Sequence, residues 1–267
     1  MYRMDTTQLY KSAQNYFLGP DNMKNEVLMW FTASGLLMQE LSKGLGNLPF
    51  GGLKNKIGHR ERNKVKSIEV LDMCSGPGNF VNHLAFVLPN IKVVCVDINA
   101  GFVEYGKRRF RRWKFVQGDV TKISLRKKFR FIVASSAYHH IPDNQKLDFL
   151  CNIRKHLTND GVVIMCDNFL PNYSGKNKQQ AAKSYYSELR KWYCHGNATP
   201  EAIRVIKGVE RTELEGCEEY KVPFKIFLAQ LKKAGLIIDT DIAVWQPYQF
   251  AKDNAGSHVL ILKINKK

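Results

Sequence analysis

The sequence predicts an α/β fold, with a mostly parallel sheet of seven strands covered by helices on both faces and joined to a helical cap. From residue 67 onward, short apolar segments alternate with segments that show helical spacing. The apolar segments have no polar alternation, as is typical of parallel strands buried on both faces. A turn with two glycines, Gly76 and Gly78, follows the first of them. Together these observations indicate a doubly wound, Rossmann-like domain with right-handed crossovers.

Each strand of the predicted sheet is a short run of mainly apolar residues. The seven runs are residues 68–72, 92–97, 113–117, 131–135, 161–166, 237–245 and 258–264. Segments with helical spacing lie between them at residues 80–88, 102–110, 143–157 and 222–234. The last of these helices is expected to end before Gly235, since glycine commonly follows the final turn of a helix.

Two stretches fall outside this alternation. Residues 1–66 show helical spacing at first and become glycine-rich and then basic, so we expect an N-terminal helical cap and a basic linker. Residues 172–221 are helix-like and are long for a connection. We therefore expect a Rossmann-like domain over residues 67–267, with a helical insertion at 172–221.

The composition predicts the compartment. The N-terminus lacks the pattern of a signal peptide, and no uninterrupted apolar stretch approaches the ~20 residues that span a bilayer. The six cysteines form no C-x-x-C pair. We expect a cytoplasmic protein with no transmembrane segment, no disulfide framework and no structural zinc.

The charge is concentrated in one segment. The chain has a formal net charge of +17, and eleven Lys and Arg residues against one acid fall between Lys107 and Arg130. This basic cluster could bind an anionic partner such as RNA or a membrane surface, or it could be a solvated face. Because it precedes predicted strands, it should lie at the amino end of the sheet. That position is opposite the expected ligand site and favours the solvated face.

Ligands of open α/β sheets bind beyond the carboxyl ends of the strands, and three such ends carry suitable residues. The first strand leads into Asp72-Met-Cys-Ser-Gly-Pro-Gly, where Gly76 and Gly78 let the backbone approach a ligand closely. The second strand ends at Asp97, whose carboxylate can accept hydrogen bonds from a ribose diol. The third ends in residues 118–120, Gly-Asp-Val, which could read an adenine edge. In this order the three features predict a site for an adenosyl group.

On these residues the chain resembles class I S-adenosylmethionine-dependent methyltransferases, over about residues 68–263. The stretch S-S-A-Y-H-H-I-P-D that begins at Ser135 is similar to the small-molecule branch of that family. The stretch L-T-N-D-G-V-V-I-M-C-D from Leu157 is similar to the same branch. The resemblance implies S-adenosyl-L-methionine as the cofactor.

The resemblance also implies a role for nine positions in binding the cofactor. They are Asp72, Cys74, Gly76 and Gly78 in the loop, Asp97 with Ile98 at the ribose, Asp119 and Val120 at the adenine, and Ser135 beneath the methionine part. Cys74 is a departure, since the family usually has the first glycine of the loop at that position. The Cys74 side chain leaves less space for the cofactor beside the loop than a glycine would.

The methyl acceptor should arrive beside His139 and His140, which follow the fourth strand. An imidazole could take a proton from the acceptor, or one histidine could only fix the loop by local hydrogen bonds. No metal site is predicted, because further His or Glu ligands cannot be placed from the sequence. Several aromatic side chains could wall off the pocket or form the core of the cap. They are Tyr10, Tyr16, Tyr185, Tyr186 and Trp192.

The sequence therefore predicts a methyltransferase that acts on O, N or C of a small-molecule acceptor. An RNA or protein methyltransferase is the alternative. The nucleophilic cysteine of RNA cytosine-C5 enzymes is missing, since residues 134–136 read Ala-Ser-Ser. A non-catalytic binding protein is a further alternative, although such proteins usually lose the glycine loop or the ribose acid. NAD binding is disfavoured because Val81 stands where G-x-G-x-x-G has its third glycine.

Overall fold

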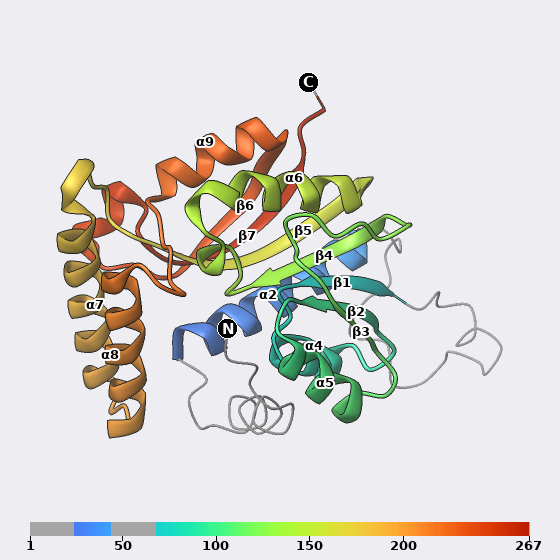
Figure 1. The fold of residues 1–267 in the computed structure, drawn as a ribbon, viewed down its shortest axis with the longest axis horizontal. Coiled ribbons are helices and arrows are strands. Elements are labelled where there is room, and N and C mark those ends of the chain that lie inside the picture. Colours follow the sequence, from blue (N-terminus) through green and yellow to red (C-terminus); the bar gives the residue numbers. More distant parts are fainter. Residues whose placement is uncertain (1–23, 44–67, 267) are drawn as a thin grey trace, which may run out of the picture.

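The computed structural model describes residues 24–43 and 68–266, and it confirms the predicted sheet (Figure 1). Among these residues, seven strands form one sheet in the order β3-β2-β1-β4-β5-β7-β6. The first five strands are parallel, and β7 runs antiparallel to both β5 and β6. Residues 1–23 and 44–66 of the predicted helical cap and basic linker lie outside the described residues.

The strands match the predicted runs closely, with one extension. They are β1 Glu69–Met73, β2 Lys92–Asp97, β3 Lys114–Gln117, β4 Phe129–Ser135, β5 Leu157–Phe169, β6 Leu236–Trp245 and β7 Gly256–Ile264. The fifth strand was expected at 161–166 and is longer at both ends. Its carboxyl end continues because Asp167 and Asn168 still pair with His258 and Ser257 of β7. This extension carries two polar side chains, Asp167 and Asn168, past the end of the neighbouring strand β4.

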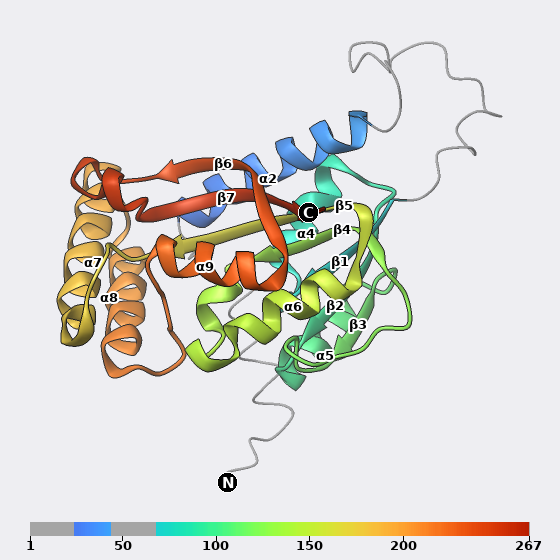
Figure 2. The ribbon, with the colours of Figure 1, turned by 90° about the horizontal axis from the view of Figure 1, so that it is seen from above.

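Helices cover both faces of the sheet (Figure 2). On one face lie α2 (Lys24–Lys43), α4 (Asn79–Val87) and α5 (Ala100–Arg109), and on the other lie α6 (Lys146–His156) and α9 (Phe224–Ala234). The strands alternate their apolar side chains between two cores. Val133 packs into the core beneath α2, α4 and α5, while Ile132 packs into the core beneath α6 and α9. The two cores give the three-layer arrangement that the continuous apolar strands predicted.

The connection from β3 to β4 contains no helix and is held in place by α6. Asn152 of α6 donates its side-chain N–H groups to the carbonyl oxygens of Val120 at 2.9 Å and Ile123 at 3.0 Å. His156 accepts from the backbone N–H of Leu125 at 2.9 Å. These bonds replace the hydrogen bonds of a helix and fix the residues that follow β3.

The insertion forms a helical hairpin beyond the carboxyl end of β5 (Figure 1, left). It consists of α7 (Lys178–His195) and α8 (Pro200–Glu215). The hairpin has its own apolar core, in which Leu189 and Ile206 pack against Trp245 at the end of β6. The predicted helical insertion is therefore present, at the edge of the sheet where the ligand site was expected.

The basic cluster lies at the opposite edge, as predicted. Residues 107–109 form the last turn of α5, Lys114 begins β3, and residues 126–128 immediately precede β4. All of these Lys and Arg side chains are exposed. No helix in the described part of the chain is both long enough and apolar enough to cross a bilayer.

Candidate functional site

The turn after β1 contains the first group of predicted cofactor residues. Its backbone is left-handed at three positions, with φ of 64° at Cys74, 54° at Gly76 and 99° at Gly78. A Cβ at Gly78 would lie 3.0 Å from the Phe110 ring, so this position requires glycine. A Cβ at Gly76 would meet nothing within 4 Å. The backbone of the turn therefore faces open space at Gly76.

Cys74 adopts a conformation that glycine reaches more readily. A left-handed φ costs an L-residue roughly 1 kcal/mol. Burial raises the pKa of the Cys74 thiol well above its usual range, and the negative charges of Asp97, Asp72, Asp167 and Asp119 add to this effect. The four carboxylates come from four different strand ends. The fold thus gathers acids that are far apart in the sequence around one turn.

Asp97, the last residue of β2, is hydrogen-bonded to the same turn. Its Oδ2 accepts from the backbone N–H of Gly76 at 2.8 Å, and its Oδ1 accepts from that of Asn99 at 2.8 Å. Burial raises the pKa of this carboxyl above its ordinary value in spite of these bonds. Each oxygen keeps a further lone pair for a ligand hydroxyl. The adjacent Ile98 side chain is 68% exposed and offers an apolar surface beside the acid.

Asp72 lies in β1 directly beneath the turn. It is buried, and its Oδ2 has no hydrogen-bond partner among the described residues. Burial, followed by the negative charge of Asp97, raises the pKa of this carboxyl well above its usual range. A buried polar atom without a partner costs about 1–3 kcal/mol, so a donor from a bound ligand would stabilise Asp72.

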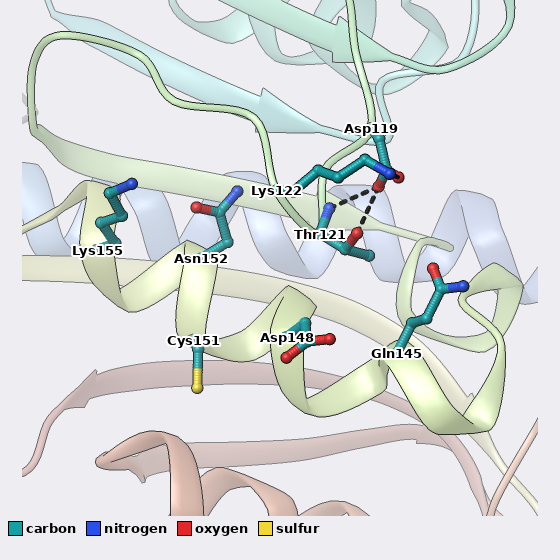
Figure 3. A pocket seen from close by; sticks show the side chains of 8 residues that line it. All are labelled: Asp119, Thr121, Lys122, Gln145, Asp148, Cys151, Asn152 and Lys155. Atoms are coloured by element: carbon teal, nitrogen blue, oxygen red, sulfur yellow. Dashed lines mark hydrogen bonds and ion pairs between the residues drawn. The ribbon is translucent and has the colours of Figure 1, made fainter.

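Asp119 and Val120 follow β3, next to α6. Oδ1 of Asp119 accepts from the N–H and the hydroxyl of Thr121 at 2.9 and 2.6 Å, and Oδ2 pairs with Lys122 at 3.0 Å (Figure 3). The side chain of Val120 is buried in the core. Asp119 therefore has local partners already, and Val120 has only its backbone to offer to an adenine edge.

A cavity of about 500 Å³ opens beside Asp119, between the β3–β4 connection and α6 (Figure 3). Polar side chains line the cavity both on the β3–β4 connection and on the side of α6. Its other lining residues are Thr121, Lys122, Gln145, Asp148, Cys151, Asn152 and Lys155. The connection is joined to the ribose acid through its backbone, because Gly118 donates its N–H to the carbonyl oxygen of Asp97 at 2.9 Å. The cavity therefore lies near the predicted cofactor site.

Helix α2 reaches the carboxyl end of β4. The indole N–H of Trp30 donates to the Ser135 hydroxyl at 3.0 Å. The next residue, Ser136, has a φ of 50° and donates its hydroxyl to Glu26 at 3.2 Å. Burial raises the pKa of Glu26 above its ordinary value. This helix thus brings an acid and an indole against the strand end where the methionine part was expected.

His139 lies in a short turn, Tyr138–His140, and is held by Asp167 at the carboxyl end of β5. Asp167 accepts from the His139 Nδ1 at 2.7 Å and from the backbone N–H of Tyr138 at 2.8 Å. Because a carboxylate can only accept, Nδ1 carries the hydrogen and Nε2 is the nitrogen that faces the site. Burial would raise the pKa of Asp167, but His139 and the N–H of Asn168 lower it below its ordinary value.

Lys146 holds the same turn from the other side. Its ammonium group donates to the carbonyl oxygens of Tyr138 at 2.7 Å and Ile141 at 2.8 Å, and lies over the Tyr138 ring. The side chain is fully buried, and this burial lowers the pKa of Lys146 to about 8. Asp167 and Lys146 together determine where His139 and His140 point.

His140 lies at the solvent side of the turn, with its side chain 46% exposed. Its Nδ1 donates to the carbonyl oxygen of Glu218 at 2.8 Å. Partial burial, followed by the neighbouring His139, holds the pKa of His140 below its ordinary value. His140 is therefore neutral near pH 7.

The segment before α9 adds a buried ion network next to the two histidines. Lys221 bonds to Glu219, and its ammonium group lies 3.7 Å from Oε2 of Glu213. The charge of Lys221 outweighs burial and lowers the pKa of Glu219 to about 2. Glu219 approaches both histidines, with Oε2 3.7 Å from His139 Nε2 and Oε1 3.8 Å from His140 Nδ1.

The aromatic residues of the insertion form the core of the cap and do not form a lid. Tyr185 and Tyr186 are fully buried and pack edge to face, and Tyr185 also packs on Trp245. Trp192 contacts Trp245 and belongs to the same cluster. Of the two alternatives for these rings, the structure favours the core of the cap, because the helices turn them towards the end of β6. Tyr10 and Tyr16 lie outside the described residues.

Most of the charged residues around the two histidines were not predicted. Asp167 could have been found by the rule that identified Asp97, since it is an acid near the carboxyl end of a strand. Glu26 lies on α2, in a segment for which the sequence predicted a helix and no polar role. Glu219 and Lys221 follow His140 by about 80 residues, and no spacing connects them to it.

The comparisons with known proteins agree with the geometry. Residues 70–161 match the family model of a methyltransferase domain. The sequence has no significant match among curated proteins. An S-adenosylmethionine-dependent methyltransferase from Clostridium acetobutylicum is similar in structure, with a TM-score of 0.54 at 11% identity, covering 97% of this chain and 99% of that chain.

Two further solved structures are similar over a part of their length. Mitomycin 7-O-methyltransferase MmcR has a TM-score of 0.50 at 13% identity, covering 74% of this chain and 49% of that chain. A structure described as a pericyclic reaction enzyme has a TM-score of 0.54 at 12% identity, covering 85% of this chain and 46% of that chain. The chain thus spans about half the length of these two proteins. At such identities the likeness shows the fold, which is that of class I methyltransferases.

Proposed function

We propose that the chain transfers a methyl group from S-adenosyl-L-methionine to a small organic molecule with an ionisable hydroxyl or amine. The match of residues 70–161 to the family model of a methyltransferase domain supports this proposal. The observation that carries this proposal is the juxtaposition at one edge of the sheet. The turn at Gly76, with its hydrogen bond to Asp97, lies next to the turn that carries His139 and His140.

The residues around the glycine turn fit the cofactor. Asp97 would accept the two ribose hydroxyls, and the exposed Ile98 would pack against the adenine. Asp119 and the backbone of Val120 would meet the adenine edge, and Ser135 would lie under the methionine part. The unpartnered Oδ2 of Asp72 and the open space at Gly76 support this placement, together with Cys74 and Gly78 in the same turn. The cofactor supplies a methyl group that is already activated on a sulfonium.

The remaining chemistry is positioning of the acceptor and removal of its proton. Positioning the acceptor in line with the methyl group accounts for most of the rate that an enzyme can add to such a displacement. A proton on the acceptor must leave during the reaction. His139, oriented by Asp167, and His140 present imidazole nitrogens at this point, next to Glu219. We assign the loss of the acceptor proton to this cluster.

A small acceptor suits the surroundings better than RNA does. Helix α2 and the α7–α8 hairpin approach the carboxyl edge, and the charges there are mainly buried ion pairs. The basic residues at 107–114 and 126–130 lie at the amino edge, whereas Lys122 pairs with Asp119 after β3. An RNA or a membrane surface bound there would be remote from the proposed methyl transfer, so we treat it as a separate partner. RNA and protein remain the alternative acceptors to be tested.

The experiment is to detect formation of S-adenosylhomocysteine with panels of small-molecule phenols, carboxylates and amines, and in parallel with RNA and protein. Turnover is expected with a member of the small-molecule panels. Turnover with RNA or protein alone would contradict the proposed acceptor class. A shared fold with a pericyclic reaction enzyme makes this product measurement necessary, because ligand binding alone does not show methyl transfer.

Two variants make the measurement specific. Asp97→Ala should abolish turnover and weaken cofactor binding by about 100-fold or more, because two hydrogen bonds to a charged group contribute roughly 3 kcal/mol. Asp160→Ala is the matched control, since Asp160 is exposed at the amino edge and pairs only loosely with Arg130. Equal cofactor affinity in the two variants would contradict the assignment of Asp97.

A further inference from the structure

The turn after β4 and the segment before α9 bring three metal-ligating side chains together. His139, His140 and Glu219 can each place a ligand atom within 4.8 Å of the other two. We propose that these three residues bind a divalent transition metal ion, with Zn²⁺ as the best match to two imidazoles and one carboxylate. We infer metal binding from the arrangement of these three side chains alone. A catalytic role for the ion, in which it binds an acceptor hydroxyl, rests on the proposed function.

His139 is prepared as a ligand. Its Nδ1 bonds to Asp167, which leaves Nε2 directed towards Glu219. A histidine that binds a metal ion almost always donates its other ring N–H to a carboxylate or a carbonyl group, which fixes the ring and raises its basicity. Asp167 is itself fixed by the N–H groups of Tyr138 and Asn168, so the ring has little freedom to turn away.

The spacing between His139 and Glu219 fits a shared ion better than a hydrogen bond. Nε2 and Oε2 are 3.7 Å apart, which is too long for a direct N–H···O bond. Ligands bound at ~2.1 Å in a tetrahedral site are separated by about 3.4 Å. An ion between the two atoms therefore needs only a small adjustment of the side chains. The half-exposed His140 ring completes the set from the solvent side, with its Nδ1 3.8 Å from Oε1 of Glu219. An ion bound by this Nδ1 would replace its hydrogen bond to the carbonyl oxygen of Glu218.

The charges around the cluster favour a cation. Five carboxylates, Glu26, Asp143, Asp167, Glu213 and Glu219, surround the histidine turn together with three ammonium groups, Lys146, Lys178 and Lys221. The carboxylates exceed the ammonium groups by two, which matches a divalent ion. Lys221 bonds to Glu219 and supports it, since a carboxylate has about four lone-pair sites and can accept from lysine while binding a metal ion.

Three protein ligands leave a fourth position open, as in catalytic zinc sites. A hydroxyl of the acceptor bound there would lose its proton to water more easily, because the ion lowers the pKa of a bound O–H group. The oxygen then attacks the methyl carbon, the new O–CH₃ bond forms and the S–CH₃ bond of the cofactor breaks. The sulfur keeps the electron pair and leaves as the thioether of S-adenosylhomocysteine.

The test is calorimetric titration of chelator-stripped protein with Zn²⁺, followed by the visible absorption of the Co²⁺ form. One ion per chain is expected for the wild type, with at least tenfold weaker binding in His140→Ala and in Glu219→Gln. His195→Ala is the matched control, because His195 is exposed on α7 and is not part of the cluster. Wild-type affinity no higher than that of His140→Ala, or an equal loss in His195→Ala, would overturn the proposal.

Cofactor binding, measured on the same samples, separates this proposal from the proposed function. S-adenosylhomocysteine should bind the stripped protein and His140→Ala as it binds the wild type, which also shows that the variant is folded. If the metal titration fails while the cofactor binds, the metal proposal is wrong and the methyltransferase proposal stands. If Zn²⁺ binds and S-adenosylhomocysteine does not, the proposed function is wrong and the metal site stands.

Discussion

Asp167→Asn is the substitution that separates the histidine turn from the cofactor loop. The Asp167 carboxylate accepts three hydrogen bonds, from Tyr138 N–H at 2.8 Å, His139 Nδ1 at 2.7 Å and Asn168 N–H at 2.8 Å. Asparagine keeps the shape of the side chain, but it has one acceptor oxygen and presents an NH₂ group in place of the other. At least one buried N–H group therefore loses its partner, whichever way the amide is turned.

The magnitude follows from these three bonds. An unsatisfied buried donor costs about 1–3 kcal/mol, and each remaining bond is weakened by about half when its acceptor becomes neutral. The total loss should therefore be about 2–4 kcal/mol of unfolding free energy. Turnover should fall by about 10²-fold or more, because His139 loses the group that fixes its Nδ1–H form. Cofactor affinity should be unchanged, since Asp97 and Gly76 bond to each other without Asp167.

Urea unfolding, followed by circular dichroism at pH 7, measures the first quantity. Ring ¹⁵N NMR shifts of His139 report which nitrogen carries the hydrogen. Asp160→Asn is the control, with a side chain that is 73% exposed and an expected change within about 0.5 kcal/mol. A stability of Asp167→Asn within about 0.5 kcal/mol of the wild type, together with an unchanged His139 spectrum, would refute the role given to Asp167.

Two further substitutions test the buried lysine and the glycine turn. Burial lowers the pKa of Lys146 from 10.5 to about 8, so the unfolded chain binds more protons than the folded chain between these values, and stability rises with pH there. In urea titrations, the unfolding free energy of Lys146→Met should rise by about 3 kcal/mol less than that of the wild type between pH 8 and 10.5. The same pH dependence in both proteins would contradict the effect assigned to Lys146. Gly78→Ala should lower the unfolding free energy by about 1–3 kcal/mol, because the φ of 99° is strained for alanine and the new Cβ would lie 3.0 Å from the Phe110 ring. The control is Gly208→Ala on α8, where a Cβ meets nothing within 4 Å and no loss of stability is expected.

The sheet and the acids at its strand ends could be predicted from the sequence because both follow from local patterns. Residues 93–96 are continuously apolar and lead to Asp97, and the structure ends β2 at that residue. The extension of β5 to Phe169 could not be predicted, since it depends on pairing with β7, nearly 90 residues later. Local patterns show where a strand is buried, but not how far its partner extends.

The acceptor end of the site was harder to predict. His139 and His140 were found because they follow a strand, but their partners Glu219 and Lys221 lie in a segment without a recognisable pattern. Tyr185 and Tyr186 lie four and three residues before Leu189, which is the spacing of a helix face. That spacing does not say whether the face meets a ligand or a neighbouring strand. The contact with Trp245 at the end of β6 decides it, and only the tertiary structure shows this contact.

The most direct test of the central claim is calorimetric titration of the purified protein with S-adenosylmethionine, S-adenosylhomocysteine and NAD. Binding of the first two with micromolar affinity, and no binding of NAD, is the predicted result, because the turn around Gly76 and Asp97 lacks the third glycine of a dinucleotide site. Binding of NAD alone would contradict the account.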